Sequence, residues 1–261
     1  PEISLDVKGP PIQMGLRKLG NRPWLVRDDF AAEELELKER LMRDPEKNVY
    51  AALGDTEEAE KAVLSLLSNM GVQPSNSASE RSLERAGLCV QEDLCLMKRT
   101  DSGWVLSAAS LCFPSRWNLL EKIGKRLDHI HEPVTGYRKN LSKKVDTFFD
   151  RLGNEPVWRR NWFIHPDNSL HQPERPPNGD PIIAFNEIGE KLFVRSERQT
   201  LRLIGIPGWI LFTIRIQRST LDDLLSKRKD EFREWIFEAP DSHHSHKGLE
   251  RNQVNEIRKA L

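Results

Sequence analysis

The sequence predicts an α+β protein, because strand-like and helix-like segments occur in separate groups along the chain. In residues 209–217, apolar side chains occupy every second position, as they do in a strand with one buried face. The turn Thr100-Asp101-Ser102-Gly103 between two short apolar segments is typical of a β-hairpin. Strands are expected at five places: 93–98, 104–112, 157–164, 191–203 and 209–217. They predict a five-stranded antiparallel sheet with its helices gathered on one face.

Helical segments are expected before, between and after these strands. Residues 29–43 are expected to form a charged helix, and residues 119–152 are expected to be helical between the second and third strands. The sequence Thr220-Leu221-Asp222-Asp223 predicts a capped helix start after the last strand. Two strands, then helices, then three strands is the order of a PAS domain, in which the helical side forms a pocket over a five-stranded sheet.

A Pro-, Ser- and Asn-rich stretch at residues 73–79 is expected to be a linker. It divides the chain into an irregular and helical extension at 1–79 and a PAS-like core at 80–219. A helical segment at 220–261 follows the core. A His-rich stretch with His243, His244 and His246 is expected to be a solvated loop rather than a metal site, because no Cys or third spaced ligand lies nearby.

The charge balance argues against a general nucleic-acid binder. The chain has 40 Lys and Arg residues against 40 Asp and Glu residues, whereas such a binder carries a basic excess. The balance is uneven locally, because residues 28–60 hold 12 acids and 4 bases, while residues 116–144 hold 8 bases and 3 acids. The basic stretch is expected to meet an anionic ligand or to form a solvated face. The acidic stretch is expected to dock a partner or to be a solvated cap.

Other features predict a protein without a membrane partner. No apolar segment approaches the ~20 residues that cross a bilayer, and no signal peptide is visible at Pro1-Glu2-Ile3. The 3 cysteines, Cys89, Cys95 and Cys112, match neither a disulfide framework nor a metal knuckle. They favour a reducing compartment, and a cytoplasmic location is expected.

Polar and aromatic residues gather in blocks among the strand-like segments. In the strand expected at 191–203, Arg195, Glu197 and Gln199 share one face, and Ser196, Arg198 and Thr200 share the other. Neither face carries the apolar residues of an ordinary core face. A strand that departs from the usual alternation of apolar and polar residues in this way tends to be part of a functional site. The other blocks are Pro114-Ser115-Arg116-Trp117, Ile130-His131-Glu132-Pro133-Val134 and Trp158-Arg159-Arg160-Asn161-Trp162.

Together with Met14-Gly15-Leu16 and Phe212-Thr213-Ile214-Arg215, these blocks resemble the heme-dependent oxidative N-demethylase alpha-subunit family over residues 12–236. The resemblance implies a PAS-fold protein that binds heme b and oxidatively demethylates a small, dimethylamine-like amine with dioxygen, releasing formaldehyde. It also implies that electrons come from NADPH through flavin and iron–sulfur components on partner chains. One departure is Thr135, where the family pattern has a second proline.

The resemblance implies an iron ligand, and two histidines remain open for that role. Neutral imidazole is the common axial ligand of heme. His131, beside the expected helical region, is the first candidate, with a helix-end His bonded to backbone as the alternative. His165 follows Trp162-Phe163-Ile164 at a strand end, and it is expected to be the axial ligand, a distal proton donor or an exposed strand-end residue. His171 is a weaker candidate, and His129 is expected at the surface.

The remaining expected site residues surround cofactor and substrate. Arg suits heme propionates and can stabilise developing negative charge, although ion pairing with Glu197 is the alternative. Glu197 is expected to hold a protonated amine or orient an Arg, and Asn161 to hydrogen-bond the amine. The expected catalytic residues are Arg160, Asn161, His165, Arg195, Glu197 and Arg198. The expected cofactor-binding residues are His131, Arg116, Trp117, Arg159 and Trp162.

Two other function classes remain compatible with the sequence. One is a heme-binding sensor of oxygen or redox state that turns over no substrate. The other is an interaction protein that keeps the fold without heme. Absorbance of the purified protein separates the last class from the others, and NADPH-linked formaldehyde release separates the enzyme from the sensor.

Overall fold

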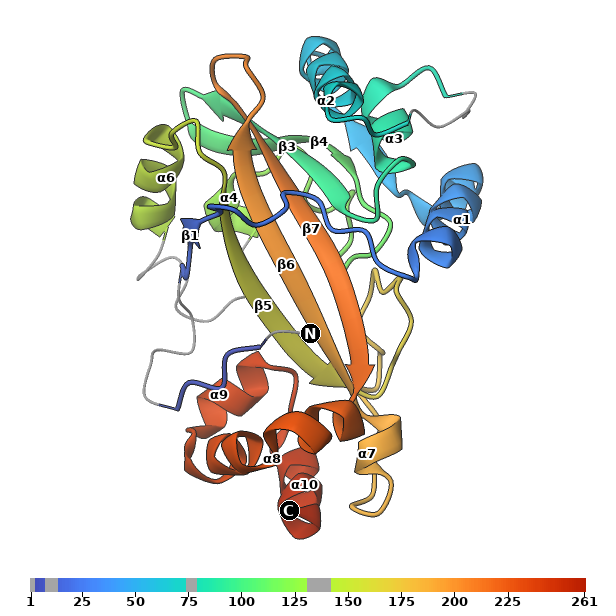
Figure 1. The fold of residues 1–261 in the computed structure, drawn as a ribbon, viewed down its shortest axis with the longest axis vertical. Coiled ribbons are helices and arrows are strands. Elements are labelled where there is room, and N and C mark those ends of the chain that lie inside the picture. Colours follow the sequence, from blue (N-terminus) through green and yellow to red (C-terminus); the bar gives the residue numbers. More distant parts are fainter. Residues whose placement is uncertain (1–2, 8–13, 74–78, 131–141) are drawn as a thin grey trace.

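The computed structural model describes residues 3–7, 14–73, 79–130 and 142–261. In this part of the chain, seven strands form one antiparallel sheet in the order β1-β5-β6-β7-β3-β4-β2 (Figure 1). The strands are β1 (Arg17–Lys18), β2 (Tyr50–Ala52), β3 (Asp93–Thr100), β4 (Gly103–Ser110), β5 (Val157–His165), β6 (Phe193–Leu203) and β7 (Trp209–Thr220).

The five expected strands are confirmed as β3 to β7, but the expected sheet of five strands is wrong. A strand was missed at each edge, where β1 pairs with β5 and β2 pairs with β4. These strands have 2 and 3 residues. Such short strands show no alternation of apolar and polar residues, and backbone hydrogen bonds to a neighbour define them.

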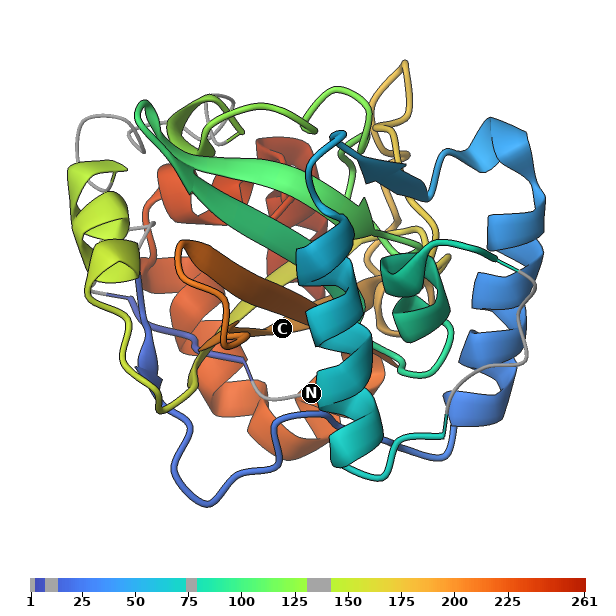
Figure 2. The same cartoon turned by 90° about the horizontal axis from the view of Figure 1, so that it is seen from above.

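Helices lie on both faces of the sheet, so the expectation that they gather on one face is wrong (Figure 2). Along β3, Leu94 and Leu96 pack in one apolar cluster with α2 and α3, whereas Cys95 and Met97 pack in another with α1, α4 and α6. Because side chains alternate along a strand, this central strand is buried on both sides. The helices near the sheet are α1 (Ala31–Arg43), α2 (Glu57–Asn69), α3 (Ser82–Gly87), α4 (Leu127–Ile130) and α6 (Ser142–Asp150).

The helical region expected at 119–152 is only partly found. Residues 119–126 form bends and turns before α4, because part of their backbone bonds to β4 while the rest bonds within the segment. Gly124 N donates to Leu106 O over 2.8 Å, and Leu106 N donates to Lys125 O over 3.1 Å. Residues 131–141, which include His131, and residues 74–78 of the expected linker lie outside the described residues.

The C-terminal helices gather at one end of the long strands β5, β6 and β7 (Figure 1). Trp162 of β5 packs edge-on against Trp235, with ring centroids 5.1 Å apart. The expected cap at Thr220 is confirmed, because its hydroxyl accepts from Asp223 N over 3.2 Å and the Asp223 carboxylate accepts from Thr220 N over 3.3 Å. The remaining helices are the short 3₁₀ helix Pro45–Lys47, α7 (Ile188–Lys191), α8 (Leu221–Glu238), α9 (Asp241–His246) and α10 (Arg251–Ala260).

The His-rich stretch is the helix α9, and the expectation of a solvated loop is wrong there. His243 and His244 are buried. The His244 ring meets Trp235 edge-on at a centroid distance of 4.8 Å, so packing against α8 explains its burial. In the described residues, no group of three or more His, Cys, Asp or Glu side chains has a metal-binding arrangement. None of the helices described is long and apolar enough to span a bilayer.

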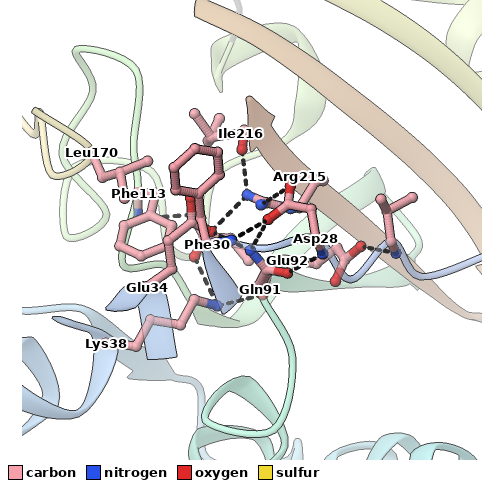
Figure 3. A network of polar contacts seen from close by, with 12 residues as sticks. Asp28, Phe30, Glu34, Lys38, Gln91, Glu92, Phe113, Leu170, Arg215 and Ile216 are labelled. Atoms are coloured by element: carbon pink, nitrogen blue, oxygen red, sulfur yellow. Dashed lines mark hydrogen bonds and ion pairs between the residues drawn. The ribbon is translucent and has the colours of Figure 1, made fainter. Parts of the chain in front are cut away.

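A buried network of charges joins α1 to the sheet (Figure 3). Arg215 of β7 pairs with Asp28 at 2.7 Å and with Glu34 at 2.8 Å. Lys38 Nζ lies 3.5 Å from the Asp93 carboxylate, whose two oxygens also accept the backbone N–H groups of residues 112 and 113 over 2.9 and 2.8 Å. Part of the acidic stretch at 28–60 is therefore paired inside the protein.

We expect Lys38→Met to lower the free energy of unfolding by about 3–5 kcal/mol, because it leaves Asp93 as an unpaired buried charge. Denaturation in urea measures this loss. The matched control on the same helix is Arg40→Met, which removes an exposed pair with Glu36 and should cost less than about 1 kcal/mol. Equal losses in the two variants would contradict a special role for the buried pair.

Candidate functional site

The register of β5 and β6 sorts the expected site residues onto opposite faces of the sheet. Asn161 lies opposite Glu197, and Arg160 lies opposite Arg198. Because directly opposed residues share a face and neighbours along a strand do not, Asn161 and Glu197 are on the other side of the sheet from Arg160 and Arg198. Arg159, His165 and Arg195 share the Glu197 face, and Trp162 shares the Arg198 face.

Glu197 is at the centre of its face and is only 6% exposed. Its carboxylate accepts hydrogen bonds from Ser115 Oγ over 2.6 Å, Gln199 Nε2 over 2.8 Å and Asn161 Nδ2 over 3.4 Å. All three donors are neutral, so they hold the carboxylate in one orientation without cancelling its charge. Asn161 and Gln199 are partly exposed, which gives the cluster an outer side.

Lys247 reaches this cluster from the C-terminal helices, and the sequence did not indicate it. Its Nζ donates to Asn161 Oδ1 over 3.1 Å and lies 5.0 Å from the centroid of the Trp162 ring. Burial, reinforced by the positive charge of Arg159, lowers the pKa of Lys247 to about 8. Lys247 is 86 positions from Asn161 and belongs to no recognised motif, so no local signal could have found it.

Gly248 allows this approach. It adopts a positive φ of 86°, and a β-carbon there would lie 2.9 Å from the carbonyl oxygen of Ile164 and 3.6 Å from His165 Cδ2. The loop between α9 and α10 can therefore lie directly against β5, where Ile164 N donates to Lys247 O over 2.8 Å. A glycine at this position holds Lys247 beside Asn161.

Arg195 is buried and fully engaged by neutral acceptors. Its Nε donates to Ser115 Oγ over 2.9 Å, and its terminal nitrogens donate to backbone carbonyls of two loops. The carbonyls belong to Phe113, Pro114, Ser169 and Leu170. Burial lowers the pKa of Arg195 to about 10, so it remains charged at neutral pH. It positions Ser115, which in turn holds Glu197.

His165 lies at the end of β5, on the same face as Arg195. It is 2% exposed, and its Nδ1 makes no hydrogen bond within the described residues. Burial lowers its pKa to about 4, and the nearby charges of Arg116 and Arg195 act in the same direction. The imidazole is therefore neutral at neutral pH. Arg116, at a positive φ of 62°, pairs with both Asp180 oxygens at 2.5 Å.

The expected residues on the opposite face contact other parts of the chain. Arg198 donates to Trp24 O over 2.8 Å, and Trp162 Nε1 donates to Ser4 O over 2.9 Å. Arg160 donates to Gln217 Oε1 over 2.9 Å. The segment after β1 covers β6 and β7 on this side (Figure 1). The structure does not bring these three side chains together with Glu197.

The described residues include the types of side chain that a heme site needs: a neutral imidazole, apolar aromatic rings and a cation. His165 offers a neutral imidazole, the form that binds iron, and its buried Nδ1 makes no hydrogen bond to the residues that the structure describes. Trp117 and Phe148 pack against the apolar cluster on the Glu197 face, and Arg159 supplies a cation on that face. His131, the first candidate for the iron ligand, is outside the described residues. The ring nitrogen of His171 lies 2.8 Å from Cys112 O, so backbone engages it.

Comparison with known proteins gives one family. The family model described as haem-dependent oxidative N-demethylase, alpha subunit-like, matches residues 68–255. This range contains the Glu197 cluster, His165 and Lys247. No curated protein matches the chain.

We expect the free energy of unfolding of His165→Gln to decrease less than that of the wild type as the pH is lowered. The folded pKa of about 4 is below the unfolded value of about 6.5, so the unfolded chain binds this proton first as the pH falls. The wild type should therefore lose up to about 3 kcal/mol more than the variant between pH 7 and pH 4. Urea denaturation across this range measures the difference. Exposed His129→Gln is the control and should follow the wild type; parallel curves for wild type and His165→Gln would refute a buried neutral imidazole.

Gly248→Ala should destabilise the protein more than Gly205→Ala. Both glycines have a positive φ, 86° and 83°, but no atom of the described part of the chain lies within 4 Å of a β-carbon at position 205. The shared backbone strain costs roughly 1–2 kcal/mol, and the contact with Ile164 O adds about 1–3 kcal/mol at position 248. Thermal unfolding compares the two variants, and equal melting temperatures would show that the loop has room to move away from β5.

Proposed function

The chain belongs to the haem-dependent oxidative N-demethylase, alpha subunit-like family, and on that premise we propose that it is an oxygenase that demethylates a small secondary amine such as dimethylamine. The observation that carries the proposal is the buried Glu197 carboxylate, which neutral donors hold beside the partly exposed Asn161. A secondary amine is a cation at neutral pH. A buried, oriented carboxylate is a suitable counter-ion because it offsets the cost of removing that cation from water.

The proposed reaction balances with two electrons and two protons. One oxygen atom of dioxygen is inserted into a C–H bond of the N-methyl group, and the other leaves as water. The hydroxymethyl amine then splits into formaldehyde and the shorter amine. Heme b would supply the activation of dioxygen. We propose that electrons come from NADPH through flavin and iron–sulfur components on partner chains.

Glu197 and the residues that hydrogen-bond around it have proposed roles in binding the amine. Glu197 binds the ammonium group, and Asn161 orients it by hydrogen bonding. Ser115 and Gln199 hold the Glu197 carboxylate, while Arg195 fixes Ser115. These contacts set the position of the methyl group before the reaction.

The proposed cofactor site also uses residues around the Glu197 face. His131 or His165 holds the iron, and Arg159, Arg116 and Trp117 surround the heme. Arg160, Trp162 and Arg198 support the sheet from its other side. We also propose that residues 80–219 form a PAS-like core, because β3 to β7 retain the strand and helix order on which that expectation was based. A cytoplasmic location remains part of the proposal.

The test combines a visible spectrum with turnover. The protein purified with a heme supply should show a Soret band, which His131→Ala or His165→Ala alone should abolish or shift. With NADPH and a reductase, it should release formaldehyde from dimethylamine. Glu197→Gln should keep the Soret band and lower kcat/KM by about 100-fold or more, because the ammonium loses its counter-ion.

Exposed Glu190→Gln on α7 is the matched control and should leave kcat/KM unchanged. Heme binding without formaldehyde release from any methylated amine would indicate a sensor instead of an enzyme. No Soret band even after addition of hemin would refute heme binding.

A further inference from the structure

Lys247, Asn161 and Glu197 place opposite charges on the two sides of one amide group. The ammonium of Lys247 meets the amide oxygen at 3.1 Å, and the Glu197 carboxylate meets the amide nitrogen at 3.4 Å. The positive charge of Lys247 therefore faces the negative end of the amide dipole, and the negative charge of Glu197 faces its positive end. The Asn161 amide therefore lies between one cation and one anion.

Lys247 differs in its partners from Lys38, the buried lysine of α1. Lys38 has the Asp93 carboxylate at 3.5 Å and two backbone carbonyls. In the described part of the chain, no carboxylate lies within 4.0 Å of Lys247 Nζ, whose hydrogen-bond acceptor is Asn161 Oδ1 alone. An ammonium has three donors, and a largely buried one without an ion pair is costly. Lys247 therefore has capacity for an anionic group.

We propose that the substrate of this site is an N-methyl amino acid, whose ammonium group binds Glu197 and whose carboxylate binds Lys247. The inference rests on the proposed function and names the substrate class of the same site. It requires a ligand with two opposite charges separated by a very short linker. Asn161, between the two charged side chains, would contact the middle of such a ligand.

The span of the site matches the smallest member of this class, N-methylglycine. The two hydrogen bonds and the width of one amide group put Lys247 Nζ and the Glu197 carboxylate no more than about 9 Å apart. An α-amino acid separates its nitrogen from its carboxylate oxygens by roughly 3 Å, and charge-assisted bonds add about 2.8 Å at each end. A ligand with one carbon between its amine and its carboxylate therefore reaches from Glu197 to Lys247.

The charges around Lys247 support a carboxylate at that end. Arg159 is close enough to lower the pKa of Lys247, so a second positive charge lies near the Lys247 ammonium. Asn161 and Lys247 are partly exposed, whereas Glu197 is buried, so the ligand's ammonium would enter first and its carboxylate would remain on the outer side. With N-methylglycine, the proposed reaction consumes dioxygen, two electrons and two protons and yields glycine, formaldehyde and water.

Calorimetric titration of the full heme-loaded chain tests the inference apart from turnover. N-methylglycine should bind at least about 10-fold more tightly than dimethylamine or acetate, each of which supplies one of the two charges. Lys247→Met should weaken N-methylglycine binding by about 10- to 100-fold and leave dimethylamine binding unchanged. Lys247→Arg should restore most of the affinity, which a purely structural role of the methylene chain would not predict.

Lys259→Met, which removes an exposed lysine paired with Glu256, is the control and should bind like the wild type. Equal affinity for N-methylglycine and dimethylamine would overturn the inference. Weaker hemin uptake by Lys247→Met, with N-methylglycine binding unchanged, would also overturn it and assign the lysine to a heme propionate.

Turnover separates this inference from the proposed function. Formaldehyde from dimethylamine with no preference for N-methylglycine would refute only the zwitterionic substrate. Tight, Lys247-dependent binding of N-methylglycine without formaldehyde from either amine would support the two-charge site and refute the demethylase.

Discussion

The burial of charged side chains in the long strands is the constraint on which the rest of the structure depends. Arg195, Glu197, Arg198 and Arg215 are each no more than 6% exposed. A buried charge is tolerated only when hydrogen bonds and counter-charges replace the water it has lost. The partners come from distant segments of the chain, so satisfying these charges also determines where the connecting segments lie.

Each buried arginine organises a different part of the protein. Arg215 draws Asp28 and Glu34 onto the sheet, which places α1. Arg198 holds the N-terminal segment through the carbonyls of Trp24 and Pro23. Arg195 gathers the loops that follow β4 and β5 through four backbone carbonyls. In the described residues, the contacts of these three arginines connect the sheet to segments that are distant in sequence.

The Glu197 cluster is different because its charges are not paired in this way. Neutral groups hold Glu197, and Lys247 has an amide oxygen and an aromatic ring as its partners. The hydrogen bonds of Arg195 and Asn161 hold the groups around Glu197 and Lys247 in place.

The sequence by itself determined the five long strands, the two unusual faces of β6 and the family. These features follow from local periodicity or from residue order, which are present in the chain before it folds. Short-range patterns did not reveal β1 and β2, because pairing with a distant neighbour creates strands of 2 and 3 residues. Nor did they predict helices on both faces of the sheet.

Only the tertiary structure decided which expected residues share a site. Register alone placed Asn161 with Glu197 and separated both from Arg160 and Arg198, although all four belong to the same two blocks of sequence. Contacts across 86 positions brought in Lys247, and the small size and positive φ of Gly248 allowed them. Such contacts leave no periodic trace in the sequence, because they depend on how distant segments pack and not on the order of neighbouring residues.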